Sequence, residues 1–146
     1  MLTTLTADAA AILHAVLGLA ALSLVMLGWM VVTRLPAMQR LGLTAQDGAH
    51  TAHLRSRLPT EALRVSDNYN HLFEAPTVFY ATSLAIVALS LADPLHAKCA
   101  WAYVGLRVVH SLVQATVNYV PLRFSLFALS WVALGTMIVR ALIASF

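Results

Sequence analysis

Long apolar runs dominate the chain and are separated by only one substantial polar segment. Residues 9–33 contain no Asp, Glu, Lys or Arg, so this run is long enough to cross a lipid bilayer once. A second uncharged run covers residues 75–92, and a third, from Lys98 to Asn118, is interrupted only by Arg107. A fourth apolar run begins at residue 124. The pattern predicts four membrane-spanning helices, at about residues 9–33, 61–92, 95–119 and 121–144.

Prolines mark the expected ends of these helices. The residue before a proline disfavours the helical conformation, so the first helix should end just before Pro36. Pro94 should end the second helix, and Pro121 stands where the first turn of the fourth helix would begin. Pro76 lies inside the second helix, where we expect a kink. Because the helices use nearly the whole chain, we predict one all-α domain, an integral membrane four-helix bundle covering residues 1–146.

The charge content supports a membrane protein and suggests its orientation. Only 10% of the residues are charged, whereas soluble domains carry about a quarter. Five of the nine basic residues lie between Arg34 and Arg64, so the positive-inside rule places this loop in the cytoplasm and both termini outside. Cys99 is the only cysteine, which excludes an intrachain disulfide and a cysteine zinc cluster. The chain has no glycine-rich phosphate loop or nucleic-acid-binding motif, so we expect no nucleic-acid partner.

A polar stripe runs along the predicted third helix. At 100° per residue its members fall within about a third of the helix circumference, and the remaining positions are mainly Val, Leu, Ala and Gly. Ionisable side chains at membrane depth are costly unless they face the interior of a bundle or an aqueous cavity, so the stripe is a candidate functional site. Its members are Tyr103, Arg107, His110, Ser111, Gln114 and Asn118.

The predicted second helix carries a matching polar face. Spacings of three and four residues bring five side chains onto that face, and Asn70 lies four residues before the last of them. They are Arg64, Asp67, Asn68, His71 and Glu74. Two interpretations remain open: a network that only fixes helix packing, and a ligand site in which Glu74 pairs with a cation. We expect no metal site, because the third helix supplies no carboxylate to match His71 and Glu74.

Arg123 occupies an unusual position two residues after Pro121. A cation in the first turn of a helix faces the positive end of the helix dipole, which costs several tenths of a kcal/mol. A bound anion would explain the position, because it would pair with the guanidinium. The alternative is that Arg123 extends to a lipid phosphate, as arginines at helix ends often do.

These residues give the chain a resemblance to the MAPEG superfamily, the membrane-associated proteins of eicosanoid and glutathione metabolism. The similarity is carried by the segment Asp67–Pro76 with Phe79-Tyr80, by Ala100–Ser111, and by Arg123-Phe124 at a matching distance. It extends over nearly the whole chain and looks closest to the bacterial branch of the superfamily.

The resemblance implies a homotrimer of four-helix protomers that holds glutathione near the cytoplasmic face, between neighbouring subunits. It implies that Arg34 contributes a basic group, that Glu74 recognises the amino end of glutathione, and that Arg123 stabilises the glutathione thiolate. The third-helix positions that line the tripeptide site correspond to Arg107, His110, Ser111 and Gln114.

The chain departs from the eicosanoid-type pattern at three of these positions. His71 stands where those members have Asn, Asp67 stands where they have Arg, and Gln114 stands where a tyrosine is often found. Replacing an arginine by an aspartate should weaken the binding of glutathione, which carries two carboxylates. Arg64, one turn before Asp67, is a candidate for the compensating cation, and we include Asn70 in the expected site.

We therefore predict a trimeric enzyme of the bacterial inner membrane with four spans and both termini outside. It would act as a glutathione-dependent transferase or peroxidase, with glutathione as co-substrate and a lipophilic electrophile or hydroperoxide arriving from the membrane lipid. Its thiolate would be favoured by the nearby guanidinium. The alternative function is a non-catalytic membrane protein that binds a lipid or amphiphile in the same pocket between subunits.

Overall fold

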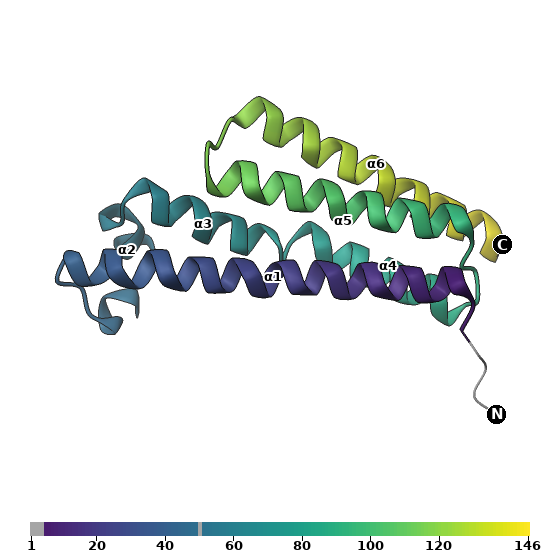
Figure 1. Cartoon of the computed structure of the whole chain (residues 1–146), viewed down its shortest axis with the longest axis horizontal. Helices are drawn as coiled ribbons and strands as arrows, with labels where there is room; N and C mark the ends of the chain where they lie inside the picture. The colour runs from purple at the N-terminus through teal and green to yellow at the C-terminus, as the bar shows by residue number, and fades with distance from the viewer. Residues whose placement is uncertain (1–4, 50) are drawn as a thin grey trace.

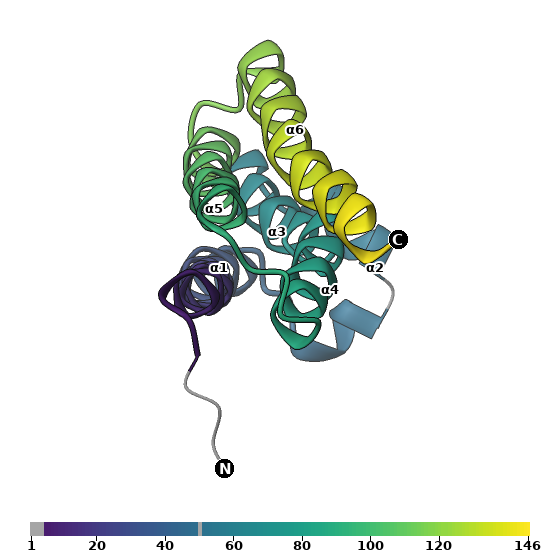
Figure 2. The same ribbon diagram turned by 90° about the vertical axis from the view of Figure 1, so that its right-hand side faces the viewer.

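In the computed structural model, residues 5–49 and 51–146 are described, and this part of the chain contains helices and no strand. The prediction of an all-α protein is confirmed. Helix α1 packs against α3, α4 and α5, while α6 packs against α5 and α4, so the long elements lie lengthwise beside one another (Figures 1 and 2). The elements are α1 (Ala7–Arg40), the 3₁₀ helix η1 (Ala45–Ala49), α2 (Thr51–Arg57), α3 (Thr60–His71), α4 (Ala75–Ala88), α5 (Pro94–Ala115) and α6 (Val120–Ser145).

Two helices, α1 and α6, are long and apolar enough to cross a membrane. Helix α4 has 14 residues and is about 21 Å long, which is less than the hydrocarbon thickness of about 30 Å. Helix α5 has 22 residues, but its polar stripe lowers its apolar character. The structure therefore supports membrane crossing for α1 and α6, and crossing by α3–α4 and α5 stays a prediction.

Helix α1 ends later than its proline suggested. It passes through Pro36 and continues for one further turn, so the predicted end near residue 33 is wrong. The helix is instead terminated by a cap at Gly42, whose φ of +64° is readily adopted only by glycine. The Gly42 N–H donates to the Gln39 carbonyl at 3.1 Å. The Leu43 N–H donates to the Met38 carbonyl at 2.9 Å, which completes a Schellman cap.

The predicted helix 61–92 is divided into α3 and α4. Pro76 causes the division, because its ring has no N–H and clashes with the carbonyl four residues earlier, on Leu72. Residues 72–74 therefore leave the helical path, and Glu74 has φ −97° and ψ −95°. The expected kink is a complete break in the helix, and His71 and Glu74 lie at its two edges.

Helices α4 and α5 end earlier than predicted, at residues 88 and 115 instead of 92 and 119. Each end is followed by a residue in the left-handed conformation, Ser90 at φ 59° and Asn118 at φ 53°. Asparagine tolerates this conformation better than most residues, and the Asn118 N–H donates to the Val113 carbonyl at 2.7 Å. The early turn at Asn118 brings the first turn of α6 back against α5.

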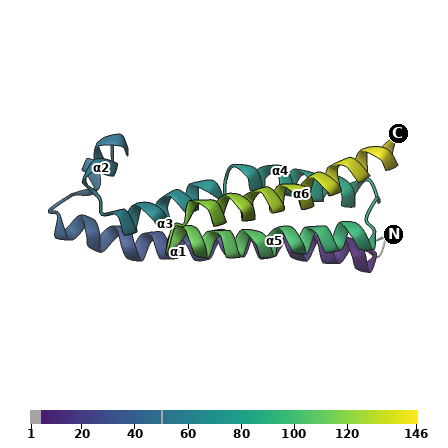
Figure 3. The same ribbon diagram turned by 90° about the horizontal axis from the view of Figure 1, so that it is seen from above.

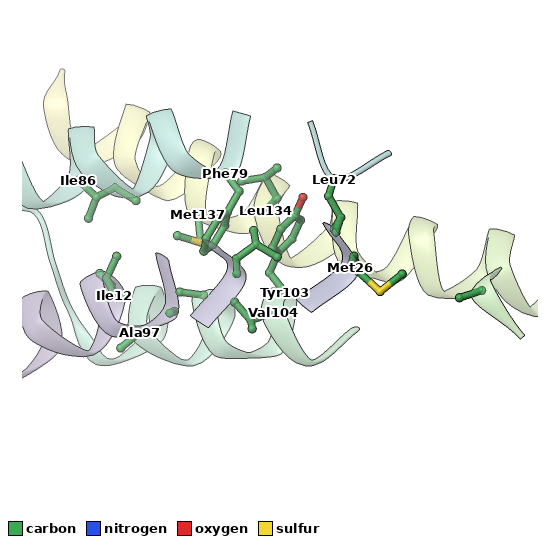
Figure 4. Packing of buried hydrophobic residues seen from close by; sticks show 14 of the residues in the cluster. Ile12, Met26, Leu72, Phe79, Ile86, Ala97, Tyr103, Val104, Leu134 and Met137 are labelled. Carbon is green, nitrogen blue, oxygen red and sulfur yellow. The ribbon is translucent and has the colours of Figure 1, made fainter. Parts of the chain in front are cut away.

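The buried core lies between α1, α4, α5 and α6 (Figure 4). The rings of Phe79 and Tyr103 stack with their centroids 4.5 Å apart and their planes 6° apart. Ile12 from α1 and Met137 from α6 are also fully buried in this cluster. The C-terminal end of α1, together with α2, extends beyond the α5–α6 turn (Figures 1 and 3). A separate apolar cluster forms there, around Leu54.

Candidate functional site

A polar cavity of about 260 Å³ opens where α3, the α3–α4 break, α5 and the first turn of α6 meet. It brings together the polar face predicted on the second helix and the far end of the stripe predicted on the third. Its lining residues are Arg64, Asp67, Asn70, His71, Glu74, Gln114, Asn118 and Arg123. The expected site residues from these elements are therefore neighbours in space, although they span 60 positions of sequence.

Hydrogen bonds join the two walls of this polar cavity. Arg64 of α3 donates from Nη1 to the Thr116 carbonyl at 2.7 Å, just after the end of α5. Asn68 donates from Nδ2 to Oε1 of Gln114 at 3.1 Å, in a buried contact between α3 and α5. The Arg64 Nε is buried and has no hydrogen-bond partner among the described residues. Arg64 thus anchors the wall of the cavity that it lines.

Asp67 does not bring an uncompensated negative charge to the polar cavity. Its carboxylate forms a two-pronged ion pair with the guanidinium of Arg55 in α2. Hydrogen bonding to this carboxylate, together with its charge, raises the pKa of Arg55 above its ordinary value. The family resemblance implied an arginine at this position, and the fold offsets the charge of the aspartate with an arginine from the polar loop.

The helix break presents His71 and Glu74 to the cavity. The His71 Nδ1 lies 3.6 Å from a Glu74 carboxylate oxygen, and 69% of the Glu74 side chain is exposed. Glu74 is therefore accessible to a ligand cation. It makes no ion pair with Arg107 or His110 in the described part of the chain.

Arg107 and Ser111 lie behind the cavity and do not line it, contrary to expectation. Arg107 is 1% exposed and donates from Nη2 to the His71 carbonyl at 3.0 Å, a carbonyl at the helix break. Its Nε and Nη1 and the Ser111 hydroxyl have no partner among the described residues. This side of the stripe packs against the break, so Arg107 supports the wall that carries His71.

Arg123 is held by a residue that the sequence did not single out for this role. Its Nη1 donates to the Oδ1 of Asn118, the residue whose left-handed conformation forms the α5–α6 turn. The Arg123 backbone N–H is already satisfied by the Tyr119 carbonyl at 3.1 Å. A neutral amide therefore positions this cation, and the helix dipole alone does not demand a bound anion. The Arg123 Nε remains buried without a partner among the described residues.

A second, apolar cavity of about 220 Å³ adjoins the first. His71 and Arg123 line both cavities, and His110 lines only the second. The rings of His71 and His110 lie with their centroids 6.4 Å apart. The rest of the apolar lining comes from one side of α6 and consists of Val120, Phe124 and Phe127.

Arg34 lies apart from both cavities within the chain. It lines a third cavity, between α1, α2 and α3, together with Arg55 and Tyr69. Asn70 lines this third cavity as well as the polar one, so the two cavities lie on neighbouring faces of α3.

Comparison with known proteins identifies the family of the chain. The model of the MAPEG family matches residues 12–143, which is nearly the entire chain. The chain belongs to the MAPEG family. No curated protein and no solved structure matches it. MAPEG proteins are membrane-associated, in accordance with the two helices that are long and apolar enough to cross a membrane.

Two residues have roles at this cavity that the sequence did not predict. Arg55 lies 12 positions before its partner Asp67 in a loop whose path the apolar pattern does not predict. Asn118 was recognised as polar, but its role in holding Arg123 depends on the turn it forms. An Asn three residues before Pro121 was the available signal, because both residues favour turns.

Proposed function

We propose that this MAPEG protein is a glutathione-dependent transferase or peroxidase that acts on lipophilic electrophiles or hydroperoxides. The observation that carries the proposal is the position of Arg123, which lines both the polar cavity and the apolar cavity beside it. A peptide thiol in the first cavity and an apolar substrate in the second would meet at this guanidinium. Holding two reactants in contact in this way accounts for a large part of many enzymatic accelerations.

The charges around the polar cavity support glutathione as the co-substrate. Arg64 and Arg123 supply two cations, Glu74 supplies one anion, and Asp67 is offset by Arg55. The resulting charge of +1 complements glutathione, whose two carboxylates and one ammonium sum to −1. In this proposal the Arg64 guanidinium contacts a carboxylate and Glu74 pairs with the ammonium.

The chemistry begins with loss of the thiol proton, which the Arg123 guanidinium favours by stabilising the thiolate. With an electrophile, the sulfur forms a bond to the electrophilic carbon as the leaving group departs. With a hydroperoxide, the sulfur takes the terminal oxygen, the O–O bond breaks, and the alkoxide is protonated to an alcohol. A second glutathione then converts the resulting sulfenic acid into a disulfide and water.

The proposal includes the assembly and orientation expected for this family. The protein would be a homotrimer in the bacterial inner membrane, with four spans, the α1–α3 connection in the cytoplasm and both termini outside. The large exposed side of the polar cavity supports completion by a neighbouring subunit, since Glu74 remains mostly accessible in one chain. The substrate would reach the apolar cavity from the lipid, past the phenyl rings of α6.

Arg123→Ala tests the function directly. Binding of glutathione should fall by only a few-fold, because Arg64 and Glu74 remain, whereas turnover at neutral pH should fall by about 100-fold. Ultraviolet absorbance of bound glutathione reports the thiolate fraction, which should decrease in Arg123→Ala and be largely retained in the control Arg123→Lys. Equal thiolate fractions and equal rates in Arg123→Ala and wild type would contradict catalysis at Arg123. The alternative of a non-catalytic amphiphile-binding protein would then be favoured.

A further inference from the structure

The third cavity, between α1, α2 and α3, has a volume of about 290 Å³ and is not used by the proposed reaction. Its lining combines two arginines with hydroxyl and amide groups on one part and apolar side chains on another. The polar members are Arg34, Thr51, Arg55, Ser66, Tyr69 and Asn70, and the apolar members are Met30, Leu58 and Leu63. Such a mixed lining suits an amphiphile with an anionic head.

The depth of this cavity in the membrane follows from α1. The helix has 34 residues and is about 51 Å long, which exceeds the hydrocarbon thickness of about 30 Å. Between Asp8 and Arg34 it carries no Asp, Glu, Lys or Arg. Arg34 is therefore the first charged residue where the apolar segment of α1 ends, at the level of the lipid headgroups.

The charge of the cavity matches a single phosphate diester. Arg55 is paired with Asp67, whereas no hydrogen bond or ion pair of the Arg34 guanidinium occurs within residues 5–49 and 51–146. Arg34 and Arg55 in the lining, together with Asp67, carry a net charge of +1. A phosphate diester carries −1, and guanidinium binds phosphate with two parallel hydrogen bonds.

We propose that the α1–α2–α3 cavity binds the phosphate of an anionic phospholipid, with Arg34 as its principal cation. Met30, Leu58 and Leu63 contact the glycerol and the first carbons of the acyl chains, and Tyr69 borders the phosphate. The bound lipid joins the end of α1 to α2, the helix that supplies Arg55 to the polar cavity. The inference does not depend on the proposed reaction, and it differs from the role in glutathione binding that the family resemblance implied for Arg34.

The proposal is tested by thermal unfolding of the full-length protein in a neutral detergent. Four additives are compared at equal concentration: phosphatidylglycerol, phosphatidylcholine, inorganic phosphate and glutathione. Phosphatidylglycerol should raise the Tm of wild type by several degrees, and phosphatidylcholine and inorganic phosphate should raise it much less. Arg34→Gln should lose most of the phosphatidylglycerol shift. The matched control is Arg40→Gln, which removes the same charge from the exposed end of α1, outside the cavity, and should keep the shift.

Each other outcome overturns the assignment. Equal losses in Arg34→Gln and Arg40→Gln would show a general attraction to surface charge, and an equal shift with inorganic phosphate would show a free-phosphate site. Loss of the glutathione shift alone in Arg34→Gln would place Arg34 in the thiol site. If Arg34→Gln fails to fold, Tyr69→Phe gives a second test, since it keeps the ring beside Phe73 but removes the hydroxyl. A phosphatidylglycerol shift unchanged in Tyr69→Phe would then contradict the proposed phosphate position.

Discussion

Replacing Arg55 by glutamine tests how much this residue contributes to glutathione binding through its contact with Asp67. Arg55 belongs to α2 and does not line that cavity, but it pairs with Asp67, which does. In Arg55→Gln the Asp67 carboxylate would face the carboxylates of bound glutathione without compensation. We therefore expect weaker glutathione binding with little loss of stability, because an exposed ion pair contributes only about 0–1 kcal/mol.

The magnitude follows from the size of the cavity. A sphere with the cavity's volume of 260 Å³ is about 8 Å across, and we take this length as the separation between Asp67 and a ligand carboxylate. At that separation, repulsion between two unit charges is roughly 0.5 kcal/mol at a dielectric constant of 80 and about 2 kcal/mol at 20. Glutathione should therefore bind roughly 2-fold to 35-fold more weakly to Arg55→Gln than to wild type.

Isothermal titration calorimetry with a double-mutant cycle provides the assay. Asp67→Asn alone should bind glutathione at least as tightly as wild type, and Arg55→Gln/Asp67→Asn should return to within about threefold of wild type. The loss in Arg55→Gln should shrink as salt is raised, since the cavity is open to solvent. Wild-type affinity in Arg55→Gln, or a double variant as weak as the single one, would refute the reasoning.

Three further predictions concern other parts of the structure. Glu74→Gln should weaken glutathione binding by up to ~1 kcal/mol, about fivefold, while crosslinking in mild detergent still stops at three subunits. Asn118→Gly preserves the left-handed turn but removes the acceptor for Arg123, so turnover should fall about tenfold with little change in Tm. Burial alone would raise the pKa of Asp93, but hydrogen bonds from the start of α5 and from Arg140 outweigh it and hold the pKa below its ordinary value. This stabilisation is present above about pH 4 and lost as pH falls further, so Tm measured from about pH 5 to pH 3 should fall more steeply in wild type than in Asp93→Asn.

The grouping of candidate site residues on each helix could be predicted, because it depends on helical periodicity. Residues at spacings of three and four share a helix face whatever the neighbouring helix is, so Arg64 and His71 lie on one face of α3, while Glu74 reaches the same cavity from the break. The same periodicity grouped the stripe on α5. It could not tell which members reach a cavity, because that depends on where the opposite helix breaks. Gln114 is buried against an intact part of α3 at the edge of the polar cavity, whereas Arg107 packs against the break.

Helix ends were predicted less well, because proline was given more weight than the residues that form caps. Pro36 is accommodated within α1, and Gly42 ends the helix through hydrogen bonds that form only in the left-handed conformation. At Ser90 and Asn118 the same conformation occurs without glycine, so composition provided only a weak signal. The contact between Arg55 and Asp67 could not be predicted, because the polar loop has no regular pattern of apolar residues that would fix the direction of α2.

Arg107 and Pro76 are best understood together. A helix break leaves backbone carbonyl groups without their intrahelical donors, and a neighbouring helix can supply a donor to one of them. The buried guanidinium of Arg107 supplies it at the His71 carbonyl, 36 positions away in sequence. A charge that looked like a ligand contact in the sequence therefore stabilises the irregular backbone that exposes Glu74. This hydrogen bond offsets part of the cost of burying Arg107 and part of the cost of breaking the helix, and it holds the backbone that forms this wall of the cavity.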